Sequence, residues 1–154
     1  MPIKVTATLN LKGIPKEIRR EFLRKAEDKR AVEAAILEEM IEGRSPVKGE
    51  KFKQYSVSYA NQKNSGARKP VNMFKSGGLY KSLTITKSGD AININFKGRA
   101  ILARYHDAPK ADSNMPQRRL LPRKAGEEFK KRIQSVINEM LNRAVFRAIT
   151  KANR

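Results

Sequence analysis

The chain has 154 residues, the size of one domain and hardly of two. It has no cysteine, which excludes disulfides, zinc thiolate sites and thiol nucleophiles. Because His106 is its one histidine, any metal site would have to consist mostly of carboxylates. Its 34 basic and 15 acidic side chains give a formal charge of +19, which favours nucleic acid, acidic protein surfaces or anionic lipid as partners. Since no apolar run approaches the roughly 20 residues of a membrane span, we expect no membrane segment.

The first two predicted elements are a strand and a long helix. Residues 3–9 alternate between apolar and polar side chains, which is typical of a half-buried strand. Residues 16–42 carry apolar side chains at helical spacing, with a bend or break expected in the charged stretch 26–30. Gly43 is a plausible end of this N-terminal helix.

Residues 44–78 differ from what precedes them, because glycine, proline and lysine are interspersed with aromatic side chains. A long insertion of this kind is commonly functional, so we predict an extended loop that orders on assembly. Its predicted docking residues are Phe52, Tyr55, Tyr59, Val71, Met73 and Phe74. Its predicted basic patch is Lys48, Lys51, Lys53, Lys63, Arg68, Lys69 and Lys75, among which Glu50 is the only acid.

The second half of the chain predicts a hairpin and another helix. Residues 79–86 and 91–97 each alternate, and Ser88, Gly89 and Asp90 between them form a turn signal. Residues 100–106 are compatible with a short helix or a strand. Residues 118–122 predict a short edge strand, in which Arg118, Arg119 and Leu120 could pair across subunits.

The last predicted helix has an apolar stripe from Phe129 to Ile149, with Glu127 and Glu128 expected in its first turn. The order of elements predicts one α+β domain over residues 1–154. In it, a small antiparallel sheet is covered by a long N-terminal and a long C-terminal helix, and 44–78 is the insertion.

No residue pattern predicts catalysis. The carboxylate of Asp107 could orient the imidazole of His106, but neighbouring residues on a strand point to opposite faces. The adjacent acids Glu38 and Glu39 diverge by about 100° on a helix and do not converge on one atom. We therefore expect no enzyme activity, cofactor or metal, and keep a small basic ribonuclease that uses His106 and Tyr105 as a hypothesis.

Several short motifs, in this order, resemble a family of tailed-bacteriophage structural proteins. These are the tail-completion or head–tail joining proteins, also called neck or virion morphogenesis proteins. The resemblance covers about residues 44–135. It rests on Ser45-Pro46-Val47, Tyr55-Ser56 with Tyr59, Pro70-Val71-Asn72-Met73, Ser76-Gly77 through Leu79, Ser82 and Leu83, then His106, Pro116, Arg118, Leu120, Pro122 and Gly126 to Phe129.

The resemblance implies a structural virion protein that forms a ring in the phage neck, between the portal and the tail. The expected partners are copies of the chain itself, in a ring of six or twelve, and the neighbouring portal or connector and tail proteins, with possible contact to the DNA in the channel. Assembly in the host cytoplasm and a final place in the virion follow from the same resemblance. The alternative, from charge and aromatic residues alone, is a nucleic-acid-binding module.

Overall fold

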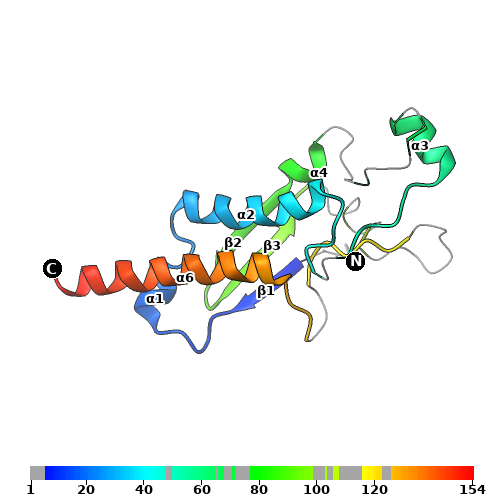
Figure 1. The fold of residues 1–154 in the computed structure, drawn as a ribbon. Coiled ribbons are helices and arrows are strands. Elements are labelled where there is room, and N and C mark those ends of the chain that lie inside the picture. Colours follow the sequence, from blue (N-terminus) through cyan, green and yellow to red (C-terminus); the bar gives the residue numbers. More distant parts are fainter. Residues whose placement is uncertain are drawn as a thin grey trace.

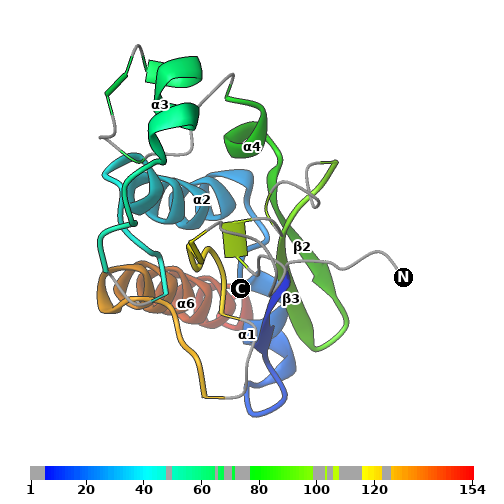
Figure 2. The same ribbon diagram turned by 90° about the vertical axis from the view of Figure 1, so that its right-hand side faces the viewer.

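The computed structural model describes residues 6–47, 50–64, 66–67, 71, 77–98, 103, 106–107, 116–122 and 126–154. The fold is α+β, with a small antiparallel sheet and a long C-terminal helix, as the sequence predicts. Helices α2 (Ala26–Ile41) and α6 (Lys131–Ala152) lie side by side over one face of the sheet (Figures 1 and 2). Among the described residues, no helix is long and apolar enough to cross a bilayer.

The described sheet has the strand order β1 (Thr6–Asn10), β3 (Ala91–Phe96), β2 (Leu83–Ser88). The predicted hairpin is confirmed: β2 pairs antiparallel with β3, and Gly89 in the turn has a φ of +55° that glycine adopts freely. Residues 79–82 differ from the prediction, because helix α4 (Gly78–Lys81) precedes the strand. The hydroxyl of Ser82 donates to the carbonyl of Leu79 at 2.6 Å and closes that turn.

The helical region predicted over 16–42 consists of two helices, and the break between them comes before the charged stretch 26–30, where the sequence places it. Helix α1 (Lys16–Glu21) is separated from α2 by a turn in which Leu23 has a φ of +49°. The turn is anchored by the buried side chains of Phe22 and Leu23. The charged stretch expected to break the helix lies inside α2, because its Asp28 is buried and pairs with Arg147 of α6.

Helix α6 confirms the predicted C-terminal helix, and buries Ile133, Ile137, Met140 and Ala144. It begins at Lys131, so Glu127 and Glu128 precede it and do not occupy its first turn. The reason is that the backbone N–H of Lys130 donates outside the helix, to the carbonyl of Pro46 at 2.7 Å.

The described part of segment 44–78 is joined to the core of the domain. It contains helix α3 (Val57–Asn64) and a bridge between Arg44 and Lys51. At its start, Gly43 has a φ of +73°, and a Cβ there would lie 3.2 Å from the carbonyl oxygen of Val71. Only glycine allows the chain to return this close to the end of α2.

Candidate assembly site

The structure places three of the six predicted docking residues of segment 44–78, Phe52, Tyr55 and Val71, in the interior of one chain. Tyr55 and Val71 are each 2% exposed, and Phe52 and Leu120 are also buried in the core. These side chains therefore cannot form the outer docking surface that the sequence predicts, because they are already packed within one subunit. Tyr59 is half-buried in α3. Met73 and Phe74 lie outside the described residues.

Two members of the predicted basic patch, Lys51 and Lys53, are exposed. Lys63 lies in α3, but its side chain is outside the described part of the chain, as are the residues Lys48, Arg68, Lys69 and Lys75.

The segment 118–122 is not a strand in the described structure, which corrects the predicted edge. Its residues are instead gathered around the buried carboxylate of Asp107. One oxygen of Asp107 accepts hydrogen bonds from the backbone N–H groups of Leu120 at 2.6 Å and Leu121 at 3.3 Å. The other accepts a bond from Arg119 at 2.8 Å, and Arg119 also pairs with Glu127. Asp107 thus holds the backbone of Leu120 and Leu121 and the side chain of Arg119 in place.

Ser45 links this segment to the start of α6. Its hydroxyl donates to the carbonyl of Arg119 at 2.7 Å and accepts from the N–H of Val47 at 3.2 Å. Pro46 accepts the N–H of Lys130. A short polar motif therefore connects segments of the chain that lie more than 70 residues apart in sequence.

Arg118 lies against the aromatic side chains that the sequence assigns to docking. Its guanidinium is 5.4 Å from the centre of the Tyr55 ring, and it donates to the carbonyl of Lys53 at 3.2 Å. The rings of Tyr55 and Tyr59 meet edge to face, with centroids 4.9 Å apart. Burial raises the pKa of Tyr59. We call the set Ser45, Tyr55, Asp107, Arg118 and Arg119 the junction; a cation–π contact with a buried arginine stabilises it.

A second buried carboxylate, Glu39 of α2, holds the beginning of α6. It accepts from Arg44 at 3.0 Å and from Lys130 at 2.9 Å, and Arg132 lies 3.5 Å away. Burial alone would raise the pKa of Glu39, but the hydrogen bonds from Lys130 and Arg44 outweigh it and lower the pKa. The sequence gives no signal for this cluster, because its members come from α2, the following segment and α6.

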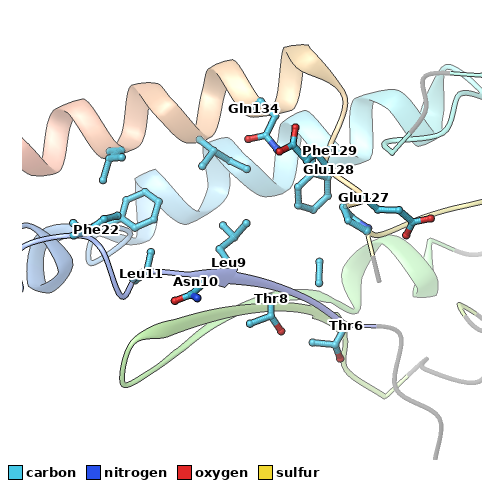
Figure 3. A pocket seen from close by; sticks show the side chains of 15 residues that line it. Thr6, Thr8, Leu9, Asn10, Leu11, Phe22, Glu127, Glu128, Phe129 and Gln134 are labelled. Atoms are coloured by element: carbon cyan, nitrogen blue, oxygen red, sulfur yellow. The ribbon is translucent and has the colours of Figure 1, made fainter. Parts of the chain in front are cut away.

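A groove of about 520 Å³ lies between β1 and the first half of α6. Figure 3 shows Leu9 and Phe129 pointing into it, and Thr6 and Thr8 pointing away on the other side of the strand. In the described strand order β1 is an edge strand, and the groove beside it is lined by both polar and apolar side chains. This geometry suits the addition of an extended strand. The sequence predicts an edge strand at 118–122, whereas the edge strands of the described sheet are β1 and β2.

In the part of the chain that the structure describes, the exposed large apolar side chains are Ile41, Val57, Phe146 and Ile149. Val57 begins α3, whereas Phe146 and Ile149 lie one turn apart near the end of α6. Figure 1 places α3 and the C-terminal end of α6 at opposite ends of the fold.

Comparison with known proteins returned no family model, no curated protein and no solved structure that matches this chain. Among the residues that the structure describes, no group of histidine and acidic side chains is arranged to hold a metal ion.

Proposed function

We propose that the chain is a structural subunit of a tailed-bacteriophage virion, which assembles into a ring in the neck and joins the portal or connector to the tail. The observation that supports this most is the junction. Residues from four of the short motifs that carry the family resemblance meet there: Ser45, Tyr55 with Tyr59, His106, and Arg118 with Leu120.

Each of these motifs is weak when taken alone, because a few residues recur by chance in any sequence. Their mutual contacts mean that each constrains the others as parts of one structural unit. A set of motifs that packs together is a better indication of a shared fold than the same motifs scattered over a surface. The bonding of Asp107 also supports a non-enzymatic role, because its carboxylate binds Arg119 and the backbone of 120–121.

The exposed apolar residues support head-to-tail contacts between copies. A closed ring with heterologous contacts needs two different surfaces on each subunit. Val57 on α3 and Phe146 with Ile149 on α6 lie at opposite ends of the fold, where two such surfaces are required (Figure 1).

Two charge-introducing variants test the proposal together. Val57→Asp and Phe146→Asp should each abolish the ring in analytical ultracentrifugation, run alone and with the portal and tail proteins of the same virion. When mixed, each variant keeps one intact surface, so the pair should stop at a dimer. Lys97→Asp, an exposed site on neither surface, is the control and should leave the ring intact. A wild-type chain that stays monomeric under all these conditions contradicts the proposal.

Among the described residues, the nucleic-acid alternative loses its stacking component; Phe74 lies outside them. Tyr55 and Phe52 are buried, and Tyr59 packs against Tyr55, so these rings are not open to bases. What remains for nucleic acid is contact with phosphates by exposed cations.

A further inference from the structure

A basic hollow of about 400 Å³ lies between the α1–α2 turn and the last turns of α6. Five of its seven lining residues are cationic: Arg24, Lys25, Arg147, Lys151 and Arg154. The other two are Thr150 and Glu21. Residues 24–25 and 147–154 are far apart in sequence, so the hollow exists only in the folded chain.

Two buried carboxylates hold three of these cations in position. Asp28 pairs with Arg147, and Glu21 pairs with Lys151 and, at 3.1 Å, with Arg24. Arg147 also donates to the backbone carbonyl of Glu21 at 3.2 Å. These contacts fix the side chains before any ligand arrives, which lowers the entropy that binding must otherwise remove.

The turn that supplies Arg24 and Lys25 has a disfavoured backbone conformation. Leu23 adopts a left-handed φ of +49°, which a leucine rarely does, and it is retained by the burial of its side chain. The consequence is that Arg24 and Lys25 point away from the core and are more than half exposed, at 57% and 55%. Strain of this kind is concentrated at binding sites.

The chemistry of the lining favours nucleic acid over protein. Protein interfaces have apolar centres, whereas protein–DNA interfaces are polar and strongly cationic. Among the described residues that line the hollow, none has an aromatic or large aliphatic side chain. Without a stacking surface, contacts are restricted to the backbone phosphates, to which guanidinium groups donate two parallel hydrogen bonds.

We propose that this basic hollow binds the backbone phosphates of double-stranded DNA without reading its sequence. The site shares the end of α6 with Phe146 and Ile149 but does not include these residues, and its occupation requires only one folded chain.

The experiment compares two double variants with the same loss of charge. Lys25→Gln/Arg154→Gln removes two exposed cations of the hollow. The ion pair of Lys25 with the exposed Glu27 is long, at 3.8 Å. Lys97→Gln/Lys131→Gln removes two exposed cations elsewhere, and Lys131 begins the helix that ends at the hollow, about 30 Å away by helix rise. Binding to a fluorescent DNA duplex of about 20 base pairs is measured by anisotropy as NaCl is raised from about 50 to 300 mM.

The hollow variant should bind about tenfold more weakly, and its salt slope should fall by about 2, one unit for each phosphate that is no longer neutralised. The control should weaken binding less than about twofold, and a duplex of unrelated sequence should bind equally. Thermal melts check that both variants fold, and Lys25→Gln alone should give about half the slope change. Equal weakening by both double variants would show a net-charge effect and overturn the proposal. The proposal would also be overturned if the hollow variant lost binding to poly-glutamate but kept its binding to the duplex, since this would assign the site to an acidic protein.

Discussion

The two ends of α6 are attached to the rest of the domain by different interactions. Near its start, Ile133 and Ile137 enter the core, and Glu39 binds Lys130 at 2.9 Å. Near its end, the larger apolar residues Phe146 and Ile149 face solvent, and cations pair with buried acids on α1 and α2. Apolar burial is almost insensitive to salt, whereas ion pairs with exposed partners are screened. One helix therefore has a firmly packed end and an end whose attachment depends on charge.

The largest effect should come from truncating the packed end. Ile133→Ala should lower the free energy of unfolding by about 3 kcal/mol, because Ile133 is 0% exposed and its removal leaves a cavity. Ile149→Ala, the same substitution at 55% exposure, should change it by less than about 0.5 kcal/mol. Urea denaturation measures both, and similar losses would mean that the two ends are packed alike.

Asp28→Asn tests the charged end. It keeps the shape of the side chain and removes the charge that pairs with Arg147, so we expect a loss of about 2 kcal/mol. Hydrogen exchange should accelerate over residues 144–152 and stay unchanged over 131–140. Glu139→Gln, at an exposed pair with Arg143, is the matched control and should cost only about 0.3 kcal/mol. Uniform acceleration along α6 would contradict two separate attachments.

Acidic pH should weaken the attachment of both ends of α6. Hydrogen bonding from Lys151 is the main cause of the lowered pKa of Glu21, and Glu39 also has a pKa below its ordinary value of 4.5. A lowered pKa in the folded state stabilises the fold above about pH 4.5, and that stability is lost as the pH falls through the folded value. Each group contributes a slope of at most about 1.4 kcal/mol per pH unit. Glu39→Gln should flatten the curve below that pH; an unchanged curve would remove Glu39 from the acid response.

The smallest effect concerns salt. Lys151→Gln should cost about 0.5 kcal/mol in dilute buffer, because Lys151 is 54% exposed although its partner Glu21 is buried. In about 1 M NaCl the difference from wild type should vanish. Lys131→Gln, exposed on the same helix, serves as the control and should show no such dependence. A cost that persists at high salt would indicate packing by the Lys151 stem.

The regular elements can be predicted from sequence because their signals are local. Alternation around Gly89 predicts the β2–β3 hairpin, and the apolar stripe of α6 predicts that helix. The break at Leu23 is misplaced in the prediction, because charge alone suggests an ending whereas Asp28 is neutralised by Arg147, more than 100 residues later. Distant partners also explain the misplaced docking residues: nothing near Tyr55 in the sequence indicates that Arg118 covers it. The basic hollow escapes prediction for the same reason.

The close approach of Gly43 to Val71 has a consequence for how this chain can vary. The two ends of the stretch between them are already brought together by the fold, with a Cβ position at Gly43 only 3.2 Å from the Val71 oxygen. For a loop whose ends are fixed, the entropic cost of added residues grows only with the logarithm of its length. At exposed positions away from the buried Phe52, Tyr55 and Ala60, this stretch can thus accept inserted peptides, such as an epitope or a fluorescent domain, while α2 and the sheet keep their positions. Any side chain at Gly43 would remove that tolerance, because it would push apart the two ends of the stretch at Gly43 and Val71.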